Sequence, residues 1–210
     1  MEGMEYVLPG EIEKRSFAII EEELKEKGIV LLNDQAPVIK RVIHTSADFD
    51  YAHTLTFSPG AIERAKTLIS GGADIVTDTN MALSGINKKK LAQFGGEAHC
   101  FMAEEKIALE AQERQMTRAA VSMEAAAGIK KPLIFAIGNA PTALVRLYEM
   151  IESGVYRPDF IIGVPVGFVN VVAAKELILK TDIPYIVSRG RKGGSGIAAA
   201  ICNAILYELK

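Results

Sequence analysis

The feature that most constrains this 210-residue sequence is the alternation of short apolar runs with longer helical patterns from residue 74 onward. Five runs, most of them rich in β-branched residues, predict buried strands: Asp74–Thr77, Ala98–Phe101, Leu133–Ile137, Phe160–Val164 and Tyr185–Ser188. Helical patterns lie near 60–70, 104–127, 141–152, 169–179 and 195–208. This order is typical of βαβ units, in which crossover helices cover a parallel sheet.

The first 50 residues carry helical patterns and no clear strand. Glu11–Lys27 is an amphipathic helix by its spacing, and a second helix from about residue 35 to 45 places Arg41 and His44 three residues apart on one face. The length favours one domain. We therefore expect a single three-layer α/β/α domain over 1–210, with a parallel sheet, a helical N-terminal arm over about 1–50 and a βα core over about 54–210.

The composition excludes several classes of protein. The 24 basic and 26 acidic side chains give a net charge of −2, which disfavours nucleic acid as a partner. Cys100 and Cys202 show no CxxC or Cys/His spacing, so we expect buried thiols and no metal site. There is no signal peptide pattern and no apolar run of 18 residues. We therefore expect a cytoplasmic protein without a membrane partner.

His44 is the histidine most suggestive of chemistry. It ends an apolar helix among polar neighbours, and imidazole gives or takes a proton near neutral pH. Spacing alone favours a structural role, in which the histidine interacts with the dipole at the helix C-terminus. Asp48 and Asp50 resemble an acid–base or metal pair only weakly, and solvated turn carboxylates are the simpler interpretation.

The segment from Ser188 to Gly196 follows the last predicted strand and begins the last helix. Its glycines let backbone amides approach a ligand, the helix N-terminus favours anions, and Arg189, Arg191 and Lys192 add positive charge. The pattern predicts a site for a carboxylate or phosphate, although a tight turn with solvated basic side chains remains an alternative. It is neither a P-loop nor a good dinucleotide fingerprint.

Two other strand-to-helix turns carry groups that would line the same predicted ligand site. Gly138–Ala143 offers the amide of Asn139, and Gly163–Asn170 offers small residues and backbone donors. Thr117 and Arg118, within the predicted helix 104–127, are a candidate source of one more cation. A surface arginine and ordinary βα turns are the structural alternatives.

Taken together, these segments resemble the precorrin-8X methylmutase family, also called cobalt-precorrin-8 methylmutase, of corrin-ring biosynthesis. Six blocks in family order carry the resemblance: Arg41–Asp50, Phe57–Gly60, Thr117-Arg118, Ala136–Ala143, Gly163–Val169 and Arg189–Ser195. The helix Glu11–Lys27, with Arg15-Ser16-Phe17, extends it over nearly the whole chain.

The resemblance implies an isomerase of cobalamin biosynthesis. It would move a methyl group from C-11 to C-12 of precorrin-8X or cobalt-precorrin-8, giving hydrobyrinic or cobyrinic acid, without a cofactor. His44 would be the general acid. Residues expected to bind the polycarboxylate substrate are Ser16, Arg41, Thr117, Arg118, Asn139, Arg189, Arg191, Lys192, Gly193, Gly194 and Ser195. The family also implies a homodimer.

Two other functions remain open on the residues alone. A non-catalytic tetrapyrrole carrier would bind the same ligand without converting it. A nucleotide-dependent α/β enzyme would bind its cofactor through Gly193–Gly196. Turnover of the macrocycle distinguishes the first alternative from the isomerase, and nucleotide binding tests the second.

Overall fold

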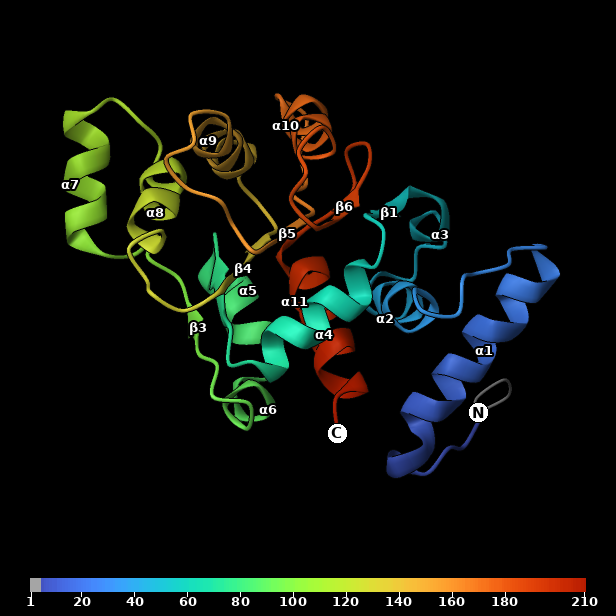
Figure 1. Ribbon diagram of the computed structural model, residues 1–210. Helices are drawn as coiled ribbons and strands as arrows, with labels where there is room; N and C mark the ends of the chain where they lie inside the picture. The colour runs from blue at the N-terminus through green and yellow to red at the C-terminus, as the bar shows by residue number, and fades with distance from the viewer. Residues whose placement is uncertain (1–4) are drawn as a thin grey trace.

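The computed structural model describes residues 5–210, which form a mixed α/β fold around one six-stranded sheet (Figure 1). The strands are β1 (Leu55–Phe57), β2 (Asp74–Thr77), β3 (Ala98–His99), β4 (Leu133–Ile137), β5 (Phe160–Gly163) and β6 (Tyr185–Ser188). The helices are the short 3-10 helix η1 (Pro9–Glu11), α1 (Ile12–Glu26), α2 (Ala36–Ser46), α3 (Tyr51–Thr54), α4 (Ala61–Ser70), α5 (Asn80–Gly85), α6 (Lys88–Ala92), α7 (Glu105–Glu113), α8 (Arg118–Ala126), α9 (Pro141–Glu152), α10 (Val171–Ile178) and α11 (Ser195–Glu208).

The sheet confirms the predicted parallel core. Its strand order is β1-β6-β5-β4-β2-β3, and every neighbouring pair is parallel except β1 with β6. The carboxyl ends of five strands therefore meet at one edge, where open α/β sheets bind their ligands. Strand β1 was not expected. Its three residues pair antiparallel with Ile186–Ser188, a tertiary contact that a run so short does not signal.

Side chains of the central strands alternate between the two faces of the sheet, which gives the three layers. In β4, Leu133, Phe135 and Ile137 belong to one buried cluster, while Ile134 and Ala136 belong to the other. Figure 1 shows α8, α9 and α10 over one face and α4, α5 and α11 over the opposite face. Successive side chains of a strand point to opposite faces of the sheet, and helices cover both faces. The central strands are therefore continuous apolar runs without polar residues within them.

The two helices of the N-terminal arm are unequally buried. Helix α2 packs along α11, and its Val42 and Ile43 lie fully inside the core cluster beneath the sheet. Helix α1 packs on α2 through Ile20 and Leu24 and leaves most of its surface exposed. The second arm helix is thus part of the α/β core, and only α1 lies at the periphery (Figure 1).

The structure corrects the predicted helix over 104–127. Two helices, α7 and α8, replace it, because Gln115 adopts a left-handed conformation (φ 51°) that ends the first helix. The side chain of Thr117 then caps the second helix by accepting a hydrogen bond from the Ala120 amide. The predicted strands at 98–101 and 160–164 are also shorter, ending at His99 and Gly163.

Candidate functional site

His44 lies exposed on the last turn of α2. The helix ends because Ala47 takes a left-handed conformation (φ 55°) at its C-cap. The imidazole stacks on the ring of Phe17 from α1, with the ring centroids 5.2 Å apart and the planes 21° from parallel. The aromatic contact leaves the histidine exposed and limits its orientation, an arrangement suited to proton transfer with a ligand.

Two hollows border His44 on opposite sides. One, of about 410 Å³, lies between α1 and α2 and is lined by Ser16, Ile19 and Phe49 among others. The other, of about 320 Å³, lies between α2 and α11 and is lined by Gly196, Asn203 and Tyr207 among others. The same imidazole reaches both spaces, so a ligand in either of them would meet it.

Arg41 lies one helical turn before His44, as its spacing predicted. Its guanidinium sits over the Phe17 ring at 4.7 Å and the Tyr207 ring at 5.2 Å, and it forms an ion pair with Glu13. Stacking between two aromatic rings fixes the plane of an arginine fork. Arg41 therefore presents an oriented cation at the junction of α1, α2 and α11.

The glycine-rich loop, residues 189–194 between β6 and α11, lies where the carboxyl ends of β2, β4, β5 and β6 meet the start of α11. A Cβ at Gly138 would lie 2.7 Å from Ser195 Cα, and one at Gly193 would lie 2.1 Å from the carbonyl oxygen of Val164. From the end of β2, Thr79 Oγ1 is 2.8 Å from Ser195 Oγ. Only glycine permits these approaches, so Gly193, Gly194 and Ser195 lie where the carboxyl ends of the parallel strands meet.

The three basic side chains of this loop already have partners. Lys192 Nζ donates to Asp48 at 2.6 Å and to Asp50 at 2.5 Å, and its hydrogen bond lowers the pKa of Asp48. Arg189 forms a two-pronged ion pair with Glu176, and Arg191 lies 5.3 Å from the ring centroid of Phe168. Lys192 thus ties the loop to the segment that follows His44.

Asn139 lies in a turn organised by a residue that the sequence reasoning missed. Fully buried Asp78 accepts hydrogen bonds from the backbone amides of Gly138, Asn139 and Ala140, at 2.8, 2.8 and 2.5 Å. Burial raises the pKa of Asp78, and the three amide donors oppose that change. An aspartate directly after a buried strand, at the ligand edge of the sheet, was the available signal.

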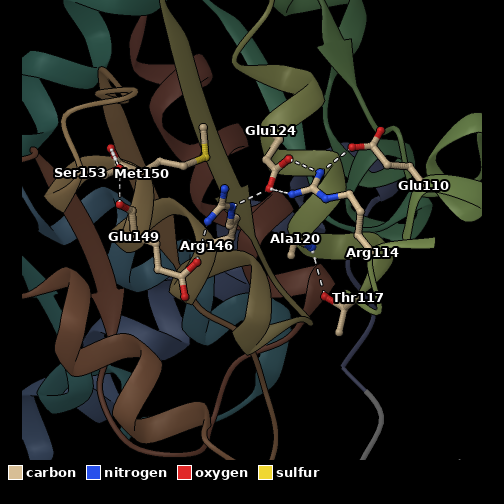
Figure 2. Close-up of polar contacts among 9 residues, drawn as sticks. All are labelled: Glu110, Arg114, Thr117, Ala120, Glu124, Arg146, Glu149, Met150 and Ser153. Carbon is tan, nitrogen blue, oxygen red and sulfur yellow. Dashed lines mark hydrogen bonds and ion pairs between the residues drawn. The ribbon is translucent and has the colours of Figure 1, made fainter. Parts of the chain in front are cut away.

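Thr117 and Arg118 lie at the start of α8, in the layer across the sheet from α2. Thr117 Oγ1 donates to Thr142 Oγ1 in the first turn of α9, at 2.9 Å. Figure 2 shows the ion pairs beside it: Arg114 bridges Glu110 and Glu124, and Arg146 also pairs with Glu124. The hydrogen bond from Arg114 lowers the pKa of Glu124.

The predicted site residues form two groups. Ser16, Arg41 and His44 line adjoining surfaces. Lys192 is connected to them by its ion pair with Asp48, and Gly196, just after Ser195, lines the same hollow as Arg41 and His44. In the second group, Asn139 follows β4, and Thr117 and Arg118 lie at the start of α8. Arg189 pairs with Glu176 of α10, and Arg191 lies over the ring of Phe168. No hydrogen bond or ion pair within residues 5–210 joins this second group to His44.

Other site classes find little support within the described part of the chain. Residues 5–210 contain no group of three or more His, Cys, Asp or Glu side chains placed to hold a metal ion. None of their helices has both the length and the hydrophobicity needed to cross a bilayer. Both cysteines are free, and burial raises the pKa of the Cys202 thiol to about 12.

Comparisons with known proteins identify the family. The precorrin-8X methylmutase family model matches residues 11–208. The chain is 43% identical to cobalt-precorrin-8 methylmutase of Salmonella typhimurium, with 96% of each protein covered. It is 40% identical to cobalt-precorrin-8 methylmutase of Priestia megaterium, over 95% of this chain and 88% of that protein.

The fold agrees with these sequence matches. The crystal structure of precorrin-8X methyl mutase from Thermus thermophilus superposes with a TM-score of 0.84 and 36% identity, covering 94% of this chain and 96% of that one. Family model, relatives and fold all span nearly the whole chain, which confirms the resemblance. The chain belongs to the precorrin-8X methylmutase family, whose members are isomerases.

Proposed function

We propose that this isomerase moves a methyl group from C-11 to C-12 of precorrin-8X or cobalt-precorrin-8, with His44 as the general acid. The observation that carries the proposal is the placement of His44: exposed, stacked on Phe17 and bordered by two hollows beside the glycine-rich loop. The products would be hydrobyrinic acid or cobyrinic acid.

The chemistry asks little of the protein beyond binding and one proton. The imidazolium of His44 would donate a proton to a ring nitrogen or methine carbon, the methyl group would migrate within the macrocycle, and the proton would return to His44. One C–C bond breaks and one forms, so the rearrangement consumes no electron donor or acceptor. Orientation of the substrate and protonation together lower the barrier.

The carboxylate arms of the substrate would meet the basic groups around the site. Arg41 and Lys192 are held by side-chain carboxylates, so a substrate carboxylate would replace Glu13 at Arg41 and Asp48 or Asp50 at Lys192. Such an exchange leaves each cation paired with one carboxylate. It also favours a substrate whose carboxylates are placed at the positions of these cations. Ser16 and Ser195 would add neutral donors, and Asn139, Thr117, Arg118, Arg189 and Arg191 would bind arms that extend across the sheet edge.

We also propose that the enzyme acts in the cytoplasm as a homodimer. Exposed apolar side chains of the arm, including Ile12 and Ile19, support association through α1. The relatives named as cobalt-precorrin-8 methylmutases favour the cobalt-loaded substrate. Parallel assays with metal-free and cobalt-loaded macrocycle would decide which form is turned over.

The proposal is tested by replacing His44 with Gln, which keeps a polar side chain but cannot deliver the proton. We expect kcat to fall by about 10²- to 10⁴-fold, the usual contribution of general acid–base catalysis. Affinity for the corrin product, followed by its absorption spectrum, should change by less than about threefold because Gln preserves most contacts. His53→Gln, on the exposed surface of α3, is the matched control.

Two outcomes would contradict this assignment. Near-normal turnover by His44→Gln would remove the histidine from the reaction. A wild-type protein that binds the macrocycle but leaves its ultraviolet–visible spectrum unchanged would be a carrier instead of an isomerase.

A further inference from the structure

Lys175 is a charged side chain that the proposed reaction does not use and that the fold buries completely. It lies on α10 with no exposed surface, and no carboxylate within residues 5–210 pairs with it. Its Nζ donates to the carbonyl oxygens of Gly190 at 2.9 Å and Lys192 at 2.8 Å. Burial lowers the pKa of Lys175 to about 8. Burying an ammonium group without a carboxylate partner costs free energy, which suggests that its two hydrogen bonds serve a function.

These two hydrogen bonds set the direction of the loop amides. Residues 5–210 contain no cis peptide bond. In a trans peptide, the carbonyl of one residue and the N–H of the next point in opposite directions. With the Gly190 and Lys192 carbonyls aimed at Lys175, the N–H groups of Arg191 and Gly193 point away from it.

The loop has further restraints that hold the same geometry. Ser188 Oγ donates to the Lys192 carbonyl at 2.7 Å, and the Gly167 amide donates to the Arg191 carbonyl at 3.2 Å. Gly193 lies against Val164, where no Cβ fits. Every carbonyl from Gly190 to Lys192 is therefore engaged on the protein side.

The amides of Arg191 and Gly193 lie on the opposite side of the loop from Lys175. Within the described residues, neither Arg191 N–H nor Gly193 N–H has a hydrogen-bond acceptor. Arg191 is exposed, Gly193 is half-buried, and α10 belongs to the layer across the sheet from α2 and His44 (Figure 1). N–H groups without a protein acceptor, next to the basic side chains of Arg191 and Lys192, can donate to an anion.

We propose that Lys175 is a positioning residue, which holds the carbonyls of Gly190 and Lys192 inward so that the N–H groups of Arg191 and Gly193 receive a carboxylate of the substrate. The inference rests on the proposed function and deepens it, because it assigns one substrate arm to backbone donors. Lys175 itself never touches the ligand. Its buried positive charge additionally favours an anion on the far side of the loop.

The test is Lys175→Met, which keeps the length of the side chain and removes the ammonium. We expect KM to rise about tenfold or more, because two charge-assisted hydrogen bonds to the substrate weaken. The value of kcat should stay within about threefold, since His44 is on another helix. Hydrogen exchange of the peptide spanning residues 189–194 should accelerate at least about tenfold. Lys180→Met, an exposed lysine just after α10, is the control and should change none of these quantities.

A second variant covers the possibility that Lys175→Met does not fold. Ser188→Ala removes one of the donors to the Lys192 carbonyl and should raise KM by about two- to fivefold with kcat unchanged. An unchanged KM in either folded variant, or equal losses in kcat and kcat/KM, would overturn the proposal. A wild-type protein without methyl-transfer activity would contradict the proposed function. Hydrogen exchange does not depend on turnover, so the exchange rates would still test whether Lys175 positions the loop.

Discussion

Single buried carboxylates and ammonium groups decide the shape of this sheet edge. Asp78 gathers three consecutive amides at the turn before α9, and Lys175 gathers two carbonyls at the turn before α11. The first turn carries Asn139 and the second carries Gly193. In both places a buried ion of one sign satisfies backbone groups of the opposite polarity, which fixes the backbone next to the ligand site.

We predict that Asp78→Asn lowers the free energy of unfolding by about 2 to 3 kcal/mol, because an amide side chain has one acceptor oxygen where three donors converge. Its NH₂ group would face either the Gly138 amide or the Asn139 and Ala140 amides, so that N–H donors would point at each other. Urea denaturation measures the loss. Asp182→Asn, which breaks only an exposed ion pair with Arg157, should cost far less, because water and salt screen a pair on the surface. Equal losses for the two variants would contradict the role assigned to Asp78.

At the residue scale, sequence reasoning located exposed groups and missed buried ones. His44 and Arg41 share a helix face, so their proximity followed from spacing. Lys175 and Asp78 interact with backbone groups far away in the sequence, and no local pattern marks such partners. The sequence also gave no sign that Lys192 is already held by Asp48 and Asp50, since that contact joins residues more than 140 positions apart.

At the scale of helices and strands, periodicity predicted what local patterns determine. The five parallel strands and helices α9, α10 and α11 were placed correctly because both faces of the sheet are buried. Strand β1, the short helices α3, α5 and α6, and the interruption between α7 and α8 were missed. Strand β1 forms because it pairs with β6, a contact between distant parts of the sequence. The interruption depends on the left-handed backbone of Gln115, a conformation that a glutamine in the sequence does not predict.

The α7–α8 junction gives a test of this account. We predict that Gln115→Gly raises the free energy of unfolding by up to about 1 kcal/mol, because glycine adopts a φ near +51° without the steric cost of a Cβ. Gln112→Gly, at an exposed position in the last turn of α7, should lower the same quantity by up to about 1 kcal/mol. Thermal or urea unfolding of both variants measures the difference. Destabilisation by both substitutions would show that the junction tolerates the left-handed glutamine at no cost.

At the scale of the whole molecule, a net charge of −2 results from local pairing of opposite charges. Three cations expected to bind substrate, Arg41, Arg189 and Lys192, each have a carboxylate partner in the structure. A polycarboxylate ligand therefore competes with side chains of the protein. This pairing reduces the non-specific attraction of polyanions to the basic side chains. It also means that a ligand binds well only if its carboxylates replace several protein carboxylates at once.

The distribution of exposed apolar side chains leads to the last prediction, a homodimer that buries the outer face of α1. Ile12 and Ile19 lie two turns apart on that face, and Ile12 is 52% exposed. We expect a mass twice that of the 22.7 kDa chain by light scattering. Ile12→Glu should weaken the dimer at least about tenfold, since burying an isoleucine is worth about 1.5 to 3 kcal/mol.

The matched control for this dimer is Leu109→Glu, where the leucine is 55% exposed. Its helix, α7, lies at the opposite side of the molecule from α1 in Figure 1. The substitution makes the same change of charge and polarity at nearly the same exposure, so it should leave the mass unchanged. A wild-type monomer at every concentration would exclude the dimer. Equal weakening by the two variants would contradict an interface at α1, because a general effect of added charge would then explain both results.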